Sequence, residues 1–310
     1  MTSATLLLPA RARLAEGSLP GDVSQALGRA DRHQAPPGAR EQLRRHFQLI
    51  PDHWPVAALT RQLDRGDAIG HAWLLVEPAH VAPDMGGARM LSHGPGLALD
   101  ERDVAELLPA LRPLFGDAGF PLDAPTPGRW YLQLPAGARL PEFSEPSEVL
   151  GEDLFAHLPD GELGRRWRAL LNEAQVVLHN HPWNAARAQQ GKPAVNSLWF
   201  WGAGMLPDFV RTGYQQVKGS DLLLRALARA ASVPPGTATD AEAVDTLVDL
   251  RQLRSASVLG NEALRPLLVA IHARELDRLV LDFADGEGYA IERAQRWRFW
   301  RRPISLAEAP

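Results

Sequence analysis

The sequence predicts an α/β protein whose C-terminal half forms a mostly parallel sheet flanked by helices, preceded by an α+β N-terminal portion. Three observations support this prediction. Helical and strand-like patterns alternate after residue 140, which is typical of a parallel sheet. Earlier strand-like runs flank short turns, as antiparallel strands do. A proline-rich connector at 135–146 separates the two portions. We therefore expect a division into 1–140 and 141–310, as two domains or as one integrated domain.

The elements of the N-terminal portion are indicated by caps and turns. Asp100 is a favourable N-cap for a helix through Leu111, in which apolar residues recur at helical spacing. Pro55 suits the first turn of another helix. The expected strands are 5–8, 73–76, 88–91 and 130–134, and the expected helices are 39–47, 55–63 and 100–111. Residues 20–37, which are rich in glycine, proline and charge, are expected to form a loop or surface segment.

The C-terminal portion is organised around the stretch from Leu170 to Gly204. Its first part has the spacing of an amphipathic helix, which must end before Pro182 because proline clashes with the preceding turn. A polar connection then leads to a strand at 195–201. The glycines at 202 and 204 permit a tight turn or the close approach of a ligand. Further helices are expected at 220–231, from 240 through 250 and at 264–276, followed by a hairpin at 278–292.

The run 293–302 holds five arginines interleaved with aromatic residues. This composition is compatible with nucleic-acid binding, but its period-two alternation favours a terminal strand. Trp297 and Phe299 would then face the core, while Arg296 and Arg298 face solvent. The net charge of -4, with 33 basic and 37 acidic residues, also argues against nucleic acid or an anionic membrane as the principal partner.

Composition sets further limits. With 45% hydrophobic residues, the chain can bury a large core. It has no cysteine, which excludes disulfides, thiol nucleophiles and thiolate metal sites. No apolar stretch approaches the roughly 20 residues that span a bilayer, and the first residues show no secretory signal. We therefore expect a cytoplasmic protein. The serine elbow, the phosphate-binding loop and the dinucleotide fingerprint are all missing from the sequence.

Several sequence phrases resemble known families. The middle of the chain resembles the archaeal-type cofactor-independent phosphoglycerate mutases, through His181-Pro182-Trp183-Asn184, Arg187, Pro193-Ala194-Val195-Asn196, Gly202-Ala203-Gly204, Lys218-Gly219-Ser220-Asp221-Leu222 and Pro235-Gly236-Thr237-Ala238-Thr239. Over nearly its whole length the chain resembles the bacterial RpfE-type regulatory proteins, through HFQLIPDHWPVAAL, RWYLQLP, HNHPWNAAR and NSLWFWGAG. These resemblances imply a mutase-like relative in the alkaline phosphatase superfamily.

The resemblance also implies two divalent metals held by an N-terminal Asp, a Ser or Thr nucleophile and C-terminal Asp and His ligands. Here the run Leu6–Leu8 is followed by no Asp-Gly, and His272 is the sole histidine beyond His181. Trp201 stands where an arginine commonly precedes the glycines of that family. We therefore expect a regulatory relative with no cofactor and no metal-dependent mutase activity.

We expect a small-anion site formed by Asn184, Arg187, Asn196, Lys218 and Ser220. These residues lie in connections that gather near strand ends, where helix N-termini and backbone amides attract phosphate or carboxylate groups. Arg187 would supply the charged planar donor, and its replacement by alanine should change stability by no more than about 0.5 kcal/mol. The alternative is that the asparagines satisfy loop backbone groups and the basic side chains are solvated.

Two further hypotheses remain open. An active mutase or phosphatase would need a rearranged ligand set, drawn from His179, His181, Asp208, Asp221, Asp240 or Asp282. Within that set His179 and His181 could form a metal pair if the chain there is extended, although the turn at Pro182 favours capping or packing. A protein-interaction module would instead expose aromatic surface around Trp183 and Trp199.

Overall fold

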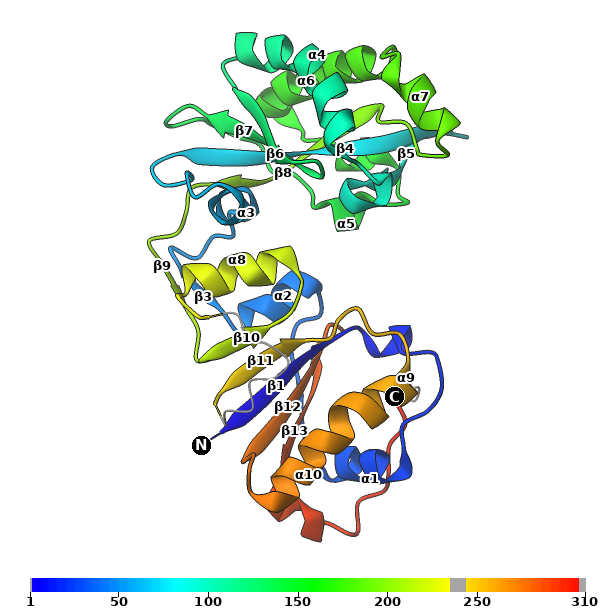
Figure 1. Cartoon of the computed structure of the whole chain (residues 1–310), viewed down its shortest axis with the longest axis vertical. Coiled ribbons are helices and arrows are strands. Elements are labelled where there is room, and N and C mark those ends of the chain that lie inside the picture. Colours follow the sequence, from blue (N-terminus) through cyan, green and yellow to red (C-terminus); the bar gives the residue numbers. More distant parts are fainter. Residues whose placement is uncertain (1, 235–243, 307–310) are drawn as a thin grey trace. The chain divides into compact units, whose positions relative to one another are not determined.

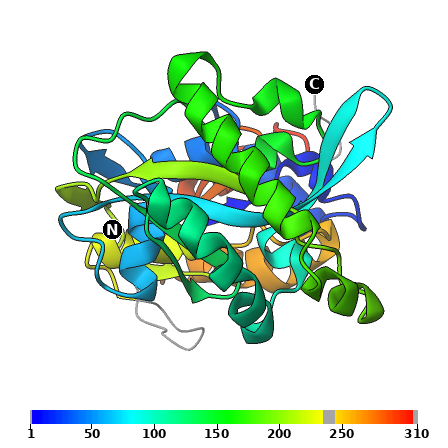
Figure 2. The same ribbon diagram turned by 90° about the horizontal axis from the view of Figure 1, so that it is seen from above.

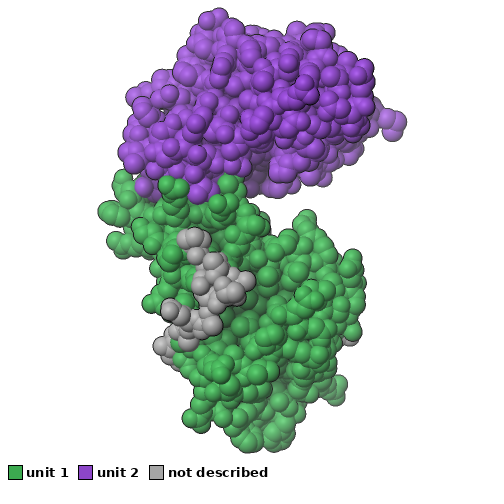
Figure 3. All heavy atoms as spheres, viewed as in Figure 1, with its two compact units in different colours: residues 1–52, 208–310 green, residues 53–207 purple. Residues whose placement is uncertain are grey.

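The computed structural model describes residues 2–234 and 244–306, and the chain divides into two compact units (Figures 1 and 3). Unit 1 comprises residues 1–52 and 208–310, and unit 2 comprises residues 53–207. The middle of the chain therefore forms one unit, and its two ends together form the other. This differs from the expected division at residue 140, because the strand that follows the polar connection pairs with a strand of the N-terminal portion.

Unit 1 is built on a six-stranded sheet in the order β10-β11-β1-β12-β13-β2 (Figure 1). Strand β1 (Ser3–Leu8) lies between β11 (Thr246–Asp249) and β12 (Arg278–Phe283) and is parallel to both. Strand β10 (Gln216–Lys218) continues the parallel part. Strands β13 (Glu287–Glu292) and β2 (Asp31–Gln34) are antiparallel additions. Four of the six strands are therefore parallel. This matches the expected parallel sheet only in part, because β1 comes from the N-terminal portion and the expected strand at 195–201 pairs antiparallel with β4.

Helices cover the unit 1 sheet. Helix α1 (Gly21–Arg29) and helix α10 (Arg265–Ala273) pack with the alternate residues Leu6 and Leu8 of β1 in one buried apolar cluster. Helix α2 (Ala39–Arg44) and helix α8 (Leu222–Ala230) complete the main helices of this unit. The shorter elements are η1 (Arg11–Arg13), α9 (Ala256–Val258), the π-helix η4 (Leu259–Leu264), η5 (Arg293–Trp297) and the ribbon of β3 (Gln48–Ile50) with β9 (Phe209–Arg211).

Unit 2 contains an antiparallel sheet centred on the long strand β4 (Ala72–Asp84). β4 pairs with β5 (Gly87–His93), β7 (Arg129–Leu134) and β8 (Ser197–Gly204), and β6 (Leu122–Thr126) pairs with β7. Helices α4 (Glu101–Asp117) and α6 (Gly161–His179) lie across these strands (Figure 2) and enclose a core that contains Trp130, Trp167 and Phe200. The other elements are α3 (Val56–Asp64), η2 (Gly94–Leu97), α5 (Pro146–Val149), η3 (Leu154–His157) and α7 (Trp183–Gln189).

Elements with strong local signals are confirmed. Asp100 caps α4 through a reciprocal capping box, in which its Oδ1 accepts from the Asp103 amide at 3.1 Å and Asp103 Oδ2 accepts from the Asp100 amide at 2.9 Å. Helix α6 ends at His179, just before Pro182. The hairpin β12–β13 follows the glycine-containing turn that the sequence indicates.

Three expectations were wrong. Residues 20–37 contain α1 and β2, because Val23 and Leu27 are buried on one face of an amphipathic helix. Residues 246–249, expected within a helix from 240 to 250, form β11, because a strand fits between β10 and β1; residues 240–243 lie outside the described residues. The run 293–302 begins as η5 and forms no terminal strand.

The aromatic side chains of that run face outward. Trp297, Phe299 and Trp300 are 65%, 75% and 69% exposed. Gln295 is the buried residue of η5, and its Nε2 donates to the Ala290 carbonyl at 3.1 Å. A tight helical turn therefore replaces the alternation of a strand. In the part of the chain that the structure describes, no helix has both the length and the apolar character needed to cross a membrane.

Candidate functional site

The parallel strands of unit 1 end at one edge of the sheet, called here the carboxyl edge. Open α/β sheets bind ligands outside this edge. Asp249 of β11 and Asp282 of β12 are the direct neighbours of Leu7 on β1, one on each side. Because neighbours in register on parallel strands point to the same face, the two carboxylates lie on the face opposite Leu6 and Leu8. Both are buried, with exposures of 6% and 2%.

Asp282 is held in a polar network. Arg45 donates from Nη2 to Oδ1 at 2.6 Å and from Nε to Oδ2 at 3.0 Å, and His46 Nε2 lies 2.6 Å from Oδ2. His46 Nδ1 lies 2.8 Å from the Tyr214 hydroxyl, which donates to Thr5 Oγ1 at 3.2 Å. This chain connects the central strand β1 to β12 through side chains alone.

Burial, hydrogen bonds and charges in this network shift the pKa values of Asp282 and Tyr214. Burial tends to raise the pKa of Asp282, but the hydrogen bonds and charges of His46 and Arg45 outweigh it and hold that pKa below its ordinary value. Burial also raises the pKa of Tyr214. Asp282 therefore stays a carboxylate and Tyr214 stays a neutral phenol near pH 7.

Asp249 has an arginine partner of its own. Arg251 donates from Nε to Oδ1 at 2.8 Å and from Nη2 to Oδ2 at 2.9 Å, a bidentate arrangement. Its Nη2 also lies 3.2 Å from Oδ1 of Asp221, the N-cap of α8. Burial tends to lower the pKa of Arg251, but these carboxylates raise it above its ordinary value. A third ion pair lies just after these strands: Nε of Arg11, which follows β1, is 2.9 Å from Oδ2 of Asp285, which follows β12.

These residues do not fit a two-metal centre. Within residues 2–234 and 244–306, no group of three or more His, Cys, Asp and Glu side chains is arranged to hold a metal ion. A two-metal site needs several such ligands around ions about 4 Å apart. At the carboxyl edge, arginines bind the oxygens that would be needed as ligands.

Two residues of the expected anion site lie at the carboxyl edge. Lys218 is the last residue of β10, and Ser220 lies in the connection to α8. The predicted cap at Ser220 is one residue early, because the side chain of Asp221 accepts from the Leu224 amide at 2.8 Å. Asn184, Arg187 and Asn196 belong to unit 2 instead.

The structure corrects the expectation that Arg187 is solvated. Arg187 and Asp103 are 0% and 1% exposed, and Arg187 Nη1 lies 2.6 Å from Asp103 Oδ2. Arg187 also donates from Nη2 to the Leu97 carbonyl at 2.6 Å and from Nε to the Pro193 carbonyl at 2.9 Å. Burial tends to raise the pKa of Asp103, but hydrogen bonds from Arg187 and Trp183 hold it below its ordinary value. Arg187 therefore ties three segments of unit 2 together.

The two asparagines bind backbone groups. Asn184 Nδ2 donates to the carbonyls of Leu178 and Val195 at 2.8 and 3.0 Å, and its Oδ1 accepts from the Val195 amide at 2.8 Å. Asn196 accepts from the Val81 amide at 2.8 Å and donates to the Val81 carbonyl at 2.7 Å. These contacts match the alternative in which the asparagines satisfy loop backbone groups.

The histidine pair does not lie in extended chain. His179 is the exposed last residue of α6, and His181 lies in the following turn, where its Nδ1 accepts from the Trp183 amide at 3.2 Å. Of the other alternative ligands, Asp208 is exposed beside β9, Asp221 and Asp282 have the partners given above, and Asp240 lies outside the described residues.

Trp183 and Trp199 do not form the exposed aromatic surface that the interaction-module hypothesis requires. Trp199 is 3% exposed and donates from Nε1 to the Ser144 carbonyl at 2.9 Å. Trp183 is partly buried against the unit 2 core, and its Nε1 donates to Asp103 Oδ1 at 2.7 Å. Both indoles are therefore parts of unit 2 packing.

The glycines that close β8 meet a helix. A Cβ at Gly202 would lie 3.0 Å from Val56 Cβ, and one at Gly204 would lie 2.8 Å from Pro55 Cβ. Gly202 also has a φ of +68°. The close approach anticipated for a ligand is thus made by the start of α3.

The sequence did not identify the residues at the carboxyl edge that hold the carboxylates. Asp249 fell in a segment expected to be helical and Arg251 directly followed that segment, so their position at the end of a strand was not recognised. The only available signal was the run Thr246–Asp249, three apolar or β-branched residues followed by an acid. His46 and Asp282 are 236 positions apart, so no local pattern connects them.

Known proteins match the sequence of part of this chain. No protein-family model matches the chain. A probable 2,3-bisphosphoglycerate-independent phosphoglycerate mutase of Geobacter sulfurreducens is 42% identical over 62 residues, and one of Methanosarcina mazei is 36% identical over 78 residues. Part of this chain is similar to phosphoglycerate mutases. The matches span 20% and 25% of this chain but only 16% and 19% of those relatives.

Two solved structures align with most of this chain. A cofactor-independent phosphoglycerate mutase from Thermoplasma acidophilum aligns over 94% of this chain and 90% of its own, with 14% identity and a TM-score of 0.43. A protein from Pyrococcus horikoshii aligns over 94% and 87%, with 13% identity and a TM-score of 0.45.

Proposed function

We propose that this chain is a regulatory, mutase-like protein of the RpfE type that binds a small phosphorylated or carboxylate anion and lacks metal-dependent mutase activity. The similarity to phosphoglycerate mutases supports the relationship. The proposed absence of metal-dependent activity is supported by the arginine partners of the carboxylates at the carboxyl edge. Asp249 pairs with Arg251, and Asp282 pairs with Arg45.

The energetic argument concerns what a metal ion would displace. Each of these carboxylates accepts a bidentate arginine, and Arg251 and Arg45 are only 16% and 19% exposed. Breaking such a pair leaves a desolvated charge behind, which costs roughly 3–5 kcal/mol when both partners are fully buried. The guanidinium groups neutralise these carboxylates, as cations would in a metal centre.

The anion would bind at the carboxyl edge beside α8. Lys218 supplies a cation and Ser220 a hydroxyl, and both lie just before α8, whose dipole favours negative charge near its N-terminus. Lys218 and Ser220 are the two members of the expected five-residue site that lie in unit 1. Arg187 and the two asparagines lie in unit 2 and bind groups of that unit.

Two assays test this function. Protein stripped with a chelator is assayed by phosphorus NMR for conversion of 3-phosphoglycerate to 2-phosphoglycerate, before and after addition of manganese, cobalt or zinc. We expect no conversion under any condition. Robust metal-dependent turnover would show an active mutase with a rearranged ligand set.

Calorimetry in metal-free buffer tests the anion separately. We expect 3-phosphoglycerate to bind, and Lys218→Gln to weaken binding by about tenfold or more, because charge-assisted hydrogen bonds contribute roughly 1.5–3 kcal/mol. Lys192→Gln is the matched control, since Lys192 pairs with Asp100 at 2.7 Å in unit 2. If the parent binds no phosphorylated or carboxylate anion, the anion part of the proposal is wrong.

A further inference from the structure

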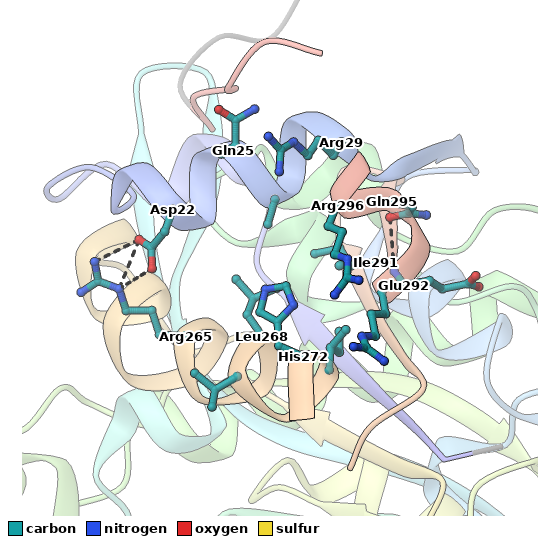
Figure 4. Close-up of a pocket in the computed structure, with 14 residues that line it drawn as sticks. Asp22, Gln25, Arg29, Arg265, Leu268, His272, Ile291, Glu292, Gln295 and Arg296 are labelled. Atoms are coloured by element: carbon teal, nitrogen blue, oxygen red, sulfur yellow. Dashed lines mark hydrogen bonds and ion pairs between the residues drawn. The ribbon is translucent and has the colours of Figure 1, made fainter. Parts of the chain in front are cut away.

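Unit 1 contains a cavity whose lining residues are remote in sequence from Lys218 and Ser220. A cavity of about 400 Å³ opens between α1, α10, β13 and η5 (Figure 4). We propose that this cavity binds an organic anion with a compact apolar body, such as an aryl carboxylate. The inference adds a ligand site to the proposed function and does not depend on the carboxyl edge.

The inner wall of the cavity is aliphatic. Ala26 comes from α1, Leu268 and Ile271 come from α10, and Ile291 comes from β13. Leu268, Ile271 and Ile291 also belong to the buried apolar cluster beneath, so the wall is a continuation of the core. Ligand pockets of about 300–1,000 Å³ with mostly apolar linings bind the apolar parts of small molecules. The volume of this cavity lies at the lower end of that range, which suits a compact ligand.

Arginine is the most frequent polar residue around that wall. Arg29 is the last residue of α1, and Arg293 and Arg296 belong to η5; all three line the cavity. Figure 4 labels Arg29 and Arg296. None of the three forms an ion pair with a carboxylate of residues 2–234 or 244–306. Two acidic residues also line the cavity, and each has a partner: Asp22 lies 2.9 Å from Arg265, and Glu292 lies 3.8 Å from Arg278.

Unsatisfied donors point to an anionic group as the missing partner. The Nε atoms of Arg29 and Arg293 are buried and have no hydrogen-bond acceptor among the described residues. Buried donors without acceptors are unfavourable. Burial, together with the positive charges of Arg274 and Arg296, holds the pKa of Arg293 below its ordinary value. A carboxylate would accept from these guanidinium groups and relieve the repulsion between them.

The aliphatic wall and the arginines of the cavity together determine which class of ligand fits it. An inorganic anion would satisfy the arginines but leave the aliphatic wall exposed to water. A neutral aromatic would cover the wall but leave the arginines without acceptors. Only a molecule that combines an apolar body with an anionic group satisfies both.

The full chain is titrated with 2-naphthoate, and binding is followed by ligand fluorescence and calorimetry. Two reference ligands separate the contributions: 2-naphthalenemethanol lacks the charge, and inorganic phosphate lacks the apolar body. We expect saturable 1:1 binding of 2-naphthoate, at least about tenfold weaker binding of the alcohol, and no displacement by phosphate at equal concentration.

Variants locate the site. Arg29→Gln and Arg293→Gln should each weaken 2-naphthoate binding by about tenfold or more, with little effect on the alcohol, and Arg29→Lys should retain part of the affinity. Arg229→Gln is the control, because Arg229 is exposed on α8 and does not line the cavity. Circular dichroism establishes that each variant is folded.

Three results would overturn the proposal: equal binding of the alcohol, unchanged binding in both arginine variants, or full displacement by phosphate. Lys218→Gln distinguishes this site from the carboxyl edge. If that substitution abolishes 2-naphthoate binding while the arginine variants do not, the ligand binds beside α8 and the cavity is not its site.

Discussion

The ion pair between Arg187 and Asp103 allows a quantitative test of how unit 2 is held together. Both side chains are buried, and Nη1 lies 2.6 Å from Oδ2. Replacing Arg187 by alanine leaves the Asp103 carboxylate without its charged partner and removes the donors to two backbone carbonyls. Loss of one partner of a buried ion pair costs about 3–5 kcal/mol, so we expect the free energy of unfolding to fall by that amount.

Urea titration followed by tryptophan fluorescence measures this change. Trp297 and Trp300 belong to unit 1, and the other seven of the nine tryptophans belong to unit 2, so the signal reports mainly on the unit that contains the ion pair. Arg165→Ala is the matched control, because Arg165 is exposed on α6, and it should change stability by less than about 0.5 kcal/mol.

A double-mutant cycle isolates the charge effect. Asp103→Asn combined with Arg187→Met removes both charges, so the double variant should be more stable than the sum of the two single losses predicts. If Arg187→Ala stays within about 0.5 kcal/mol of the parent, Arg187 is not the structural tether inferred above.

Three further changes have defined outcomes. The stabilisation that ionised Asp282 contributes to the fold should be complete above its unfolded pKa of about 3.9 and should be lost as the pH falls through its lower folded pKa. The urea midpoint of the parent should therefore be level from about pH 7 to 5 and fall below about pH 4. In Asp282→Asn this fall should be smaller. Tyr214→Phe should lower the free energy of unfolding by about 1 kcal/mol, as measured by urea titration with circular dichroism. An unchanged urea midpoint would show that the Tyr214 hydroxyl does not stabilise the fold. Gly202→Ala should lower the free energy of unfolding by about 1–3 kcal/mol, because of the positive φ and the contact with Val56. Gly116→Ala in α4 is the control, since a Cβ there meets open space, and it should be neutral or stabilising. Equal effects of the two substitutions would contradict this reasoning.

Local chemistry explains which parts of the fold the sequence could predict. The capping box at Asp100 and the β12–β13 hairpin depend on residues within a few positions of each other. Strand β11 depends on distant neighbours, since it pairs with β1 and β10. The division into units depends on β8 pairing with β4 more than a hundred positions earlier, and apolar spacing contains no information about that pairing.

The same limit applies to the site. Lys218 was expected near a strand end only because connections in α/β folds gather there, and it is the last residue of β10. The partner of Arg187 could not be found, because Asp103 lies on a separate helix and its burial depends on tertiary packing. A buried arginine and a solvated one have the same sequence signature, so only the structure distinguishes an internal tether from an anion donor.

Manganese binding to the metal-free protein tests most directly whether the carboxyl edge holds metal ions. Free aqueous Mn²⁺ gives an electron paramagnetic resonance signal that bound Mn²⁺ loses. With Asp249 and Asp282 bound to Arg251 and Arg45, the free signal should rise in proportion to added Mn²⁺ from the first addition. Loss of one or two equivalents of free Mn²⁺ per chain, restored in Asp249→Asn or Asp282→Asn, would contradict the assignment of these carboxylates to arginine.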